Sequence, residues 1–144
     1  MGTRSNIGYI NDEGKIRAAY CHYDGYVAYN GRVLLEHYTD AAKVQELVEL
    51  GDMSILAPKV HPTPDSGHSF ENNEDGVTVF YGRDRGENDV APVTHDVISD
   101  WVGDKDSWVE YYYLFMPELG TWMVYSVHNK RWKQVTEDLI KQEA

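Results

Sequence analysis

Residues 7–21 read IGYINDEGKIRAAYC, and this stretch sets how the chain begins to fold. Two short runs rich in β-branched and aromatic residues, 7–10 and 15–21, flank the segment Asn11-Asp12-Glu13-Gly14. Turn-forming residues followed by glycine suit the loop between two antiparallel strands. The sequence therefore predicts a β-hairpin at the start of the fold.

A second hairpin is predicted near the other end of the chain. The runs 108–116 and 121–127 flank Pro117-Glu118-Leu119-Gly120, and both runs are apolar on both faces. Such strands lie in the centre of a sheet or are covered on each side. The three consecutive tyrosines at 111–113 must alternate across the sheet, so one face is expected to meet a helix, another copy of the chain or a ligand. A homo-oligomer is therefore one expectation.

Helices are predicted mainly between the two hairpins. Thr39 or Asp40 can cap a helix over 41–50, which Gly51 ends. The other predicted elements are a helix over 31–38, a strand over 77–81, a short helix over 94–101 and a helix over 136–142 that Thr136 caps. Residues 57–76 have the composition of a long exposed loop. We expect one α+β domain over residues 1–144, with an antiparallel sheet built from hairpins at both ends and packed with three or four helices.

Composition and charge exclude several classes of partner. The chain carries 24 Asp and Glu against 13 Lys and Arg, a net charge of -11, and residues 71–118 hold twelve acidic against three basic residues. This field repels phosphate backbones, so we expect basic partners and no direct binding to duplex nucleic acid. No long apolar run or signal-peptide pattern is present, so we expect no membrane contact and a cytoplasmic location.

One cluster of functional side chains stands out where the first hairpin ends. The candidate binding residues, which combine stacking rings with an imidazole, a carboxylate and a planar cation, are His22, Tyr23, Asp24, Tyr26, Tyr29 and Arg32. A nucleotide or a partner peptide would suit these groups, with Arg32 facing a phosphate. The alternative is that Tyr20 and Tyr26 pack in the core while Asp24-Gly25 forms a turn.

The sequence gives weaker signals for catalysis or metal binding than for this binding cluster. His22, Asp24 and His37 would be the residues of a small hydrolase or nuclease, the alternative function, or of a transition-metal site. No HExxH, CxxC, GxSxG, GxGxxG or GxxxxGK pattern occurs, so we expect no cofactor and no metal. Cys21 is the only cysteine, and we expect it to be a buried small hydrophobe.

Five short segments carry a resemblance to a known group: TRSNI at 3–7, YCHYDGY at 20–26, NG at 30–31, LLEHY at 34–38 and LGDMS at 50–54. In these segments the chain resembles small, mostly uncharacterised accessory proteins of tailed bacteriophages and prophages. The resemblance spans residues 2–57, with a fainter likeness over 108–127. It implies a viral protein that binds and antagonises a host bacterial defence or regulatory factor without catalysis. Such a protein acts in the host cell cytoplasm as a protein inhibitor or by sequestration of a nucleotide signal.

Overall fold

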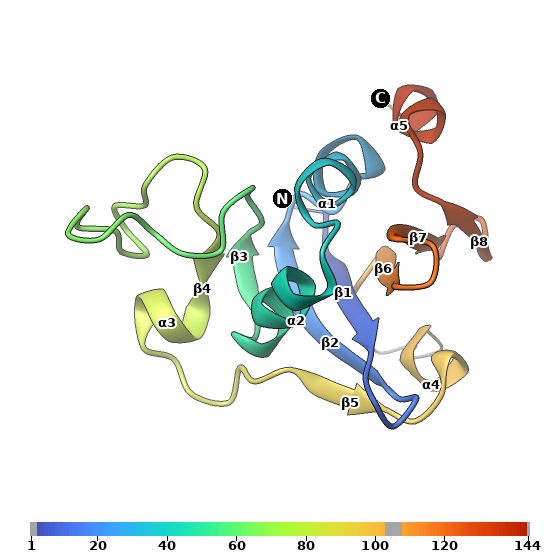
Figure 1. The fold of residues 1–144 in the computed structure, drawn as a ribbon, viewed down its shortest axis with the longest axis horizontal. Helices are drawn as coiled ribbons and strands as arrows, with labels where there is room; N and C mark the ends of the chain where they lie inside the picture. The colour runs from blue at the N-terminus through green and yellow to red at the C-terminus, as the bar shows by residue number, and fades with distance from the viewer. Residues whose placement is uncertain (1–2, 103–107, 144) are drawn as a thin grey trace.

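The computed structural model describes residues 3–102 and 108–143, which form a mixed sheet with helices on both faces (Figure 1). The strands are β1 Ser5–Ile10, β2 Ile16–Tyr23, β3 Met53–Ile55, β4 Val79–Phe80, β5 Val93–His95, β6 Tyr111–Met116, β7 Thr121–Ser126 and β8 Arg131–Gln134. The helices are the π-helix η1 Val27–Gly31 and the α-helices α1 Arg32–His37, α2 Ala41–Glu49, α3 Tyr81–Arg85, α4 Ile98–Val102 and α5 Glu137–Glu143. None of these helices is long and apolar enough to cross a membrane.

The sheet confirms the two hairpins but corrects the expected topology. Its order is β4-β3-β2-β1-β6-β7-β8, with β5 added to β2. The hairpins β1–β2 and β6–β7 are antiparallel, as the sequence predicts. The prediction of an antiparallel sheet is only partly right, because β1 runs parallel to β6 and β2 runs parallel to β3. The second of these pairs is joined by a crossover through η1, α1 and α2, which returns the chain to the same end of the sheet.

Several short elements depart from the predictions. The described residues contain five α-helices and a π-helix, more than the three or four helices expected. The strands β3, β5 and β8 and the helix α3 have no predicted counterpart. The helix expected over 94–101 begins only at Ile98, because Thr94 and His95 pair with β2 as part of β5. These elements are three to five residues long, too short to establish a hydrophobic period of their own.

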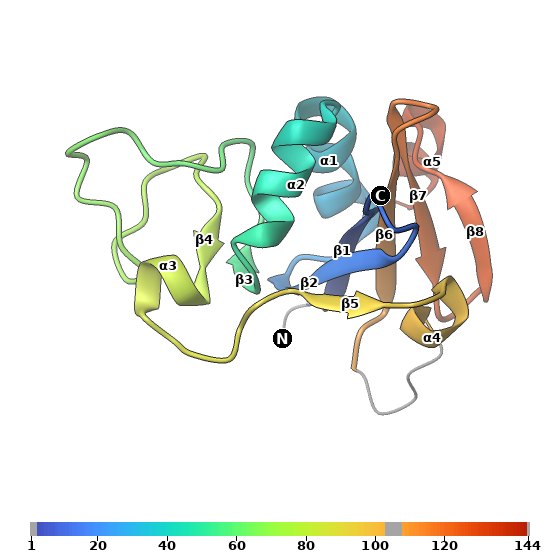
Figure 2. The same cartoon turned by 60° about the horizontal axis from the view of Figure 1, so that its bottom comes forward.

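The two faces of the sheet carry separate apolar cores. The larger core lies under α1, α2 and α5 and includes Leu34, Leu47 and Trp122. The smaller core lies under α4 and includes Trp101 and Tyr112. Figure 2 shows α1 and α2 above β1 and β2, with β5 and α4 below them. The predicted alternation of the tyrosines at 111–113 is confirmed, because Tyr112 alone of the three faces the smaller core.

The predicted helix caps are also present. The Asp40 side chain accepts a hydrogen bond of 3.3 Å from the Ala42 N–H at the start of α2, and Gly51 takes a φ of 91° just beyond its end. Thr136 accepts a hydrogen bond of 3.1 Å from the Leu139 N–H at the start of α5. Local sequence signals therefore set the ends of these two helices.

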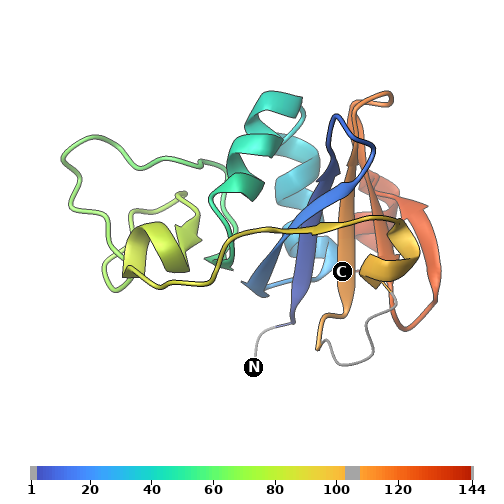
Figure 3. The ribbon, with the colours of Figure 1, turned by 90° about the horizontal axis from the view of Figure 1, so that it is seen from below.

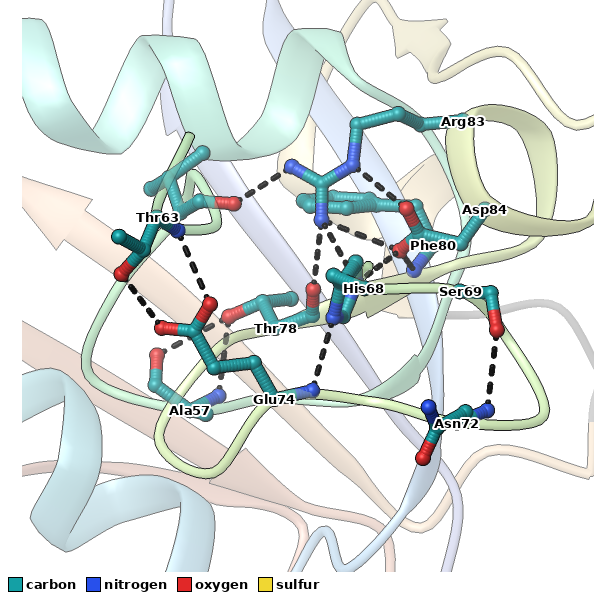
Figure 4. A network of polar contacts seen from close by, with 11 residues as sticks. Ala57, Thr63, His68, Ser69, Asn72, Glu74, Thr78, Phe80, Arg83 and Asp84 are labelled. Carbon is teal, nitrogen blue, oxygen red and sulfur yellow. Dashed lines mark hydrogen bonds and ion pairs between the residues drawn. The ribbon is translucent and has the colours of Figure 1, made fainter. Parts of the chain in front are cut away.

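The long loop between β3 and β4 lies beside the sheet together with α3 (Figure 3). A buried polar network holds it there (Figure 4). The Arg83 guanidinium donates to the carbonyls of Val60 and Thr78, at 2.6 and 2.9 Å, and to the Asp84 carboxylate. His68 Nδ1 accepts the Glu74 N–H at 3.0 Å, so Nε2 carries the proton and donates to Asp84 Oδ2 at 3.1 Å. The loop is thus tied to α3 through charge-assisted hydrogen bonds.

Candidate functional site

The candidate site lies where β2 ends and the chain turns into η1. Tyr23, the last residue of β2, is paired with Ile55, the last residue of the parallel strand β3. Ligands in open α/β sheets bind outside the carboxyl ends of parallel strands, and π-helical turns frequently occur at functional sites. The local backbone therefore has two features that are typical of a binding site.

Gly25 makes the tight turn between strand and helix possible. Its N–H donates to the Thr3 carbonyl at 2.7 Å, and its own carbonyl accepts the Tyr113 hydroxyl at 2.6 Å. An added Cβ would lie 2.8 Å from the Thr3 oxygen and 2.9 Å from the Ser5 Cβ. Only glycine therefore permits this approach of the turn to β1.

Three tyrosines project from this turn to solvent. Tyr23, Tyr26 and Tyr29 are 40%, 51% and 42% exposed, and with Asp24 we name them the tyrosine surface. Tyr23, Asp24, Tyr29 and Ile55 line a shallow depression of about 340 Å³. Burial of part of its ring and the nearby Asp24 carboxylate raise the pKa of Tyr29, so its hydroxyl is protonated at neutral pH. Tyr29 therefore presents a neutral hydroxyl at this surface.

The residues beneath the tyrosine surface are buried. Asn30, in η1, is fully buried, and its Nδ2 donates to the Ser5 hydroxyl at 3.2 Å. Cys21 is fully buried as expected, and burial raises the pKa of its thiol to about 12. That thiol donates to the Tyr23 carbonyl at 3.0 Å. The sequence pattern gave no sign that Asn30 would support the turn.

The depression is not lined by the other predicted site residues, which are His22, Tyr26 and Arg32. His22 Nδ1 shares a hydrogen bond of 2.7 Å with the Tyr20 hydroxyl, and its ring meets Tyr23 edge-on with centroids 4.5 Å apart. The Arg32 guanidinium forms ion pairs of 3.0 Å with Glu36 and 3.2 Å with Glu137. It therefore joins α1 to α5, instead of facing a phosphate beside the tyrosines.

The residues of the alternative hydrolase or metal site do not form one cluster. His37, exposed on α1, lies 3.9 Å from Glu36, whereas His22 is held by Tyr20. Among residues 3–102 and 108–143, no group of three His, Cys, Asp or Glu side chains is arranged to hold a metal ion. Tyr26, which the alternative packing scheme placed in the core, is exposed.

Comparison of the chain with protein-family models, with curated proteins and with solved structures finds no match. The resemblance to phage accessory proteins stays a prediction from the sequence.

Proposed function

We propose that this chain is a non-catalytic binding protein whose tyrosine surface docks onto a host bacterial protein. In this role it would be a phage accessory protein that antagonises a defence or regulatory factor in the host cytoplasm. The observation that carries the proposal is the exposure of Tyr23, Tyr26 and Tyr29, of which Tyr23 and Tyr29 line a shallow depression. Tyrosine is enriched at protein interfaces, where its ring supplies contact area and its hydroxyl a hydrogen bond.

The rigidity of the underlying turn supports this role. The backbone is fixed by the Gly25 contacts to Thr3 and Tyr113 and by the buried Asn30 side chain. Because the tyrosines start from a fixed base, a partner has to order only their side chains. Preorganisation of this kind raises affinity by lowering the entropy lost on binding.

Charge favours a protein over a nucleotide as the ligand. The net charge of the chain is -11, and Asp24 lies in the depression itself. The predicted phosphate ligand, Arg32, is neutralised by two carboxylates. A basic protein surface meets a complementary field at this site, whereas a nucleotide phosphate meets repulsion.

Affinity capture from host bacterial cells tests the proposal. The tagged protein, the double variant Tyr26→Ser/Tyr29→Ser and the control Leu119→Ser are compared, with mass spectrometry of captured proteins and small molecules. Leu119 is an exposed apolar residue in the turn between β6 and β7. We expect a host protein that the double variant loses and the control retains.

Arg32→Ala separates the protein-inhibitor route from sequestration of a nucleotide signal. Exposed ion pairs such as those of Arg32 contribute about 0 to 1 kcal/mol to stability, so this variant should fold. A captured protein should remain bound to Arg32→Ala. A co-purifying nucleotide that this variant loses would contradict the protein-binding proposal and favour the nucleotide route.

A further inference from the structure

A second concavity opens at a gap along one edge of β2. Residues 16–18 of that strand pair with β5, and Cys21 and Tyr23 pair with β3. Between these partners the Tyr20 N–H donates to the Asp52 side chain at 3.0 Å. The Asp52 carboxylate thus accepts the hydrogen bond that a neighbouring strand would otherwise accept, and it lies in the wall of this concavity.

The cavity has a volume of about 300 Å³ and lies on the face opposite α1 and α2. Its wall includes Asn6, Tyr20, Asp52, His95, Trp101 and Tyr112. Trp101 and Tyr112 are each 2% exposed, and their rings meet edge-to-face with centroids 5.3 Å apart. The aromatic part of the wall is therefore fixed by packing.

Asp52 is held in place by the backbone. Its N–H donates to the Val90 carbonyl at 2.8 Å, and its carbonyl accepts the Tyr81 N–H at 3.1 Å. Burial raises the pKa of its carboxyl, and the Tyr20 N–H offsets part of this effect. Within the described part of the chain, no lysine or arginine forms an ion pair with Asp52. The carboxylate is partly desolvated and has no ion-pair partner among the residues that the structure describes.

We propose that this cavity, which we name the Asp52 cavity, binds a small organic cation with N–H donors, an alkylammonium or guanidinium group. A carboxylate in a partly desolvated site gains most from a charged donor. Tryptophan and tyrosine rings add attraction for a cation within about 6 Å of a ring centroid. The net charge of -11 concentrates cations near the protein and opposes phosphorylated ligands.

The same chemistry is offered by two sources, a free amine and a basic side chain of another protein. Isothermal titration calorimetry with putrescine and methylguanidinium measures the first, and titration with capped Gly-Lys-Gly and Gly-Arg-Gly peptides measures the second. Tetramethylammonium, which has no N–H donor, is the chemical control. We expect one cation to bind per chain with saturation, and tetramethylammonium to bind more weakly. Tighter binding of putrescine or methylguanidinium than of the peptides would identify a free small molecule as the ligand. Tighter binding of the peptides would identify a basic side chain of another protein.

Asp52→Asn is the matched variant, because its amide oxygen can still accept the Tyr20 N–H while the charge is removed. Hydrogen bonds to charged groups contribute about 1.5 to 3 kcal/mol, so affinity should fall about tenfold or more. Asp12→Asn makes the same charge change at an exposed turn and should bind like the native chain. Equal affinity in Asp52→Asn and the native chain, or no saturable binding of any N–H cation, would overturn the proposal.

A second variant keeps the test valid if Asp52→Asn unfolds. Val93, on β5, lines the cavity and is 57% exposed. Val93→Trp leaves Asp52 intact and places a bulky ring at the cavity wall, so it should weaken binding without a large change in Tm. Undiminished binding to a folded Val93→Trp variant would place the cation elsewhere and contradict the assignment.

Discussion

The Asp84→Asn substitution should destabilise the protein and release the long loop. The Asp84 side chain is 4% exposed and accepts hydrogen bonds from Arg83 Nε and the Phe80 N–H, both at 2.8 Å. His68 Nε2 lies 3.1 Å from the same carboxylate. Asparagine keeps the shape but removes the charge that these donors share.

The expected loss of stability follows from the burial of the network. Breaking a buried ion pair costs about 3 to 5 kcal/mol. Because the Arg83 side chain is 21% exposed, water can solvate part of it, and we expect the lower end, about 3 kcal/mol. A domain of this size loses about 2 to 4 °C in Tm per kcal/mol, so Tm should fall by about 6 to 12 °C.

The contribution of Asp84 to the free energy of unfolding depends on pH with a definite sign. Burial alone would raise the pKa of Asp84, but the hydrogen bonds from Arg83, the Phe80 N–H and His68 outweigh it and lower the pKa below the ordinary 3.8. Such a carboxyl gives stability that is complete above its unfolded pKa and is lost as pH falls through its folded pKa. The difference in unfolding free energy between the native chain and Asp84→Asn should therefore shrink below about pH 4.

Urea unfolding at neutral and acidic pH measures the free energies, and hydrogen exchange measures the loop. The amides of Lys59, Glu74 and Thr78, which are hydrogen-bonded within the loop, should exchange faster in Asp84→Asn. Asp65→Asn, an exposed change in the same loop at a residue with φ of 61°, is the control and should resemble the native chain. Stability within about 0.5 kcal/mol of native in Asp84→Asn, with unchanged loop exchange, would refute this account of the network.

Three further outcomes are expected. Gly25→Ala should destabilise by about 1 to 3 kcal/mol in chemical unfolding, because its Cβ would lie 2.8 Å from the Thr3 carbonyl oxygen; a neutral effect would mean that the turn relaxes freely. Trp122→Ala should cost about 3 to 5 kcal/mol by calorimetry, because the indole is fully buried and donates to the Tyr38 carbonyl; a loss under 1 kcal/mol would contradict the packing of the larger core. The Cys21 thiol, with a pKa of about 12 caused by burial, should resist alkylation at pH 8 until the protein unfolds, and rapid labelling of the native chain would contradict its burial.

The local parts of the fold follow from the sequence, and the long-range parts do not. Both hairpins and the caps at Asp40 and Thr136 depend on residues within a few positions of one another. The parallel pairing of β1 with β6 joins segments about a hundred residues apart, and no local pattern encodes it. The strand β5 is three residues long and largely exposed, so it lacks the apolar alternation that identifies a strand.

At the candidate site too, the local features follow from the sequence and the long-range contacts do not. The turn residues around Asp24-Gly25 predict that Tyr23 and Tyr29 lie near a strand end, and both are exposed there, with Tyr23 as the last residue of β2. Arg32 and Glu137 are 105 positions apart in the chain, and their pairing depends on α5 packing beside η1, so it was not predicted. Asp52 had no predicted role either, because its contact with the Tyr20 N–H arises only where two short strands leave a gap.

Site-specific photocrosslinking in host bacterial cells tests the binding role of the tyrosine surface most directly. A benzophenone amino acid replaces Tyr26, which is 51% exposed on that surface, or Leu119, which is 62% exposed in the turn between β6 and β7. We expect illumination to join position 26 to one host protein, with loss of the adduct when excess native protein competes. Adducts that form equally from both positions, or only from position 119, would contradict the claim that the tyrosine surface is the binding surface.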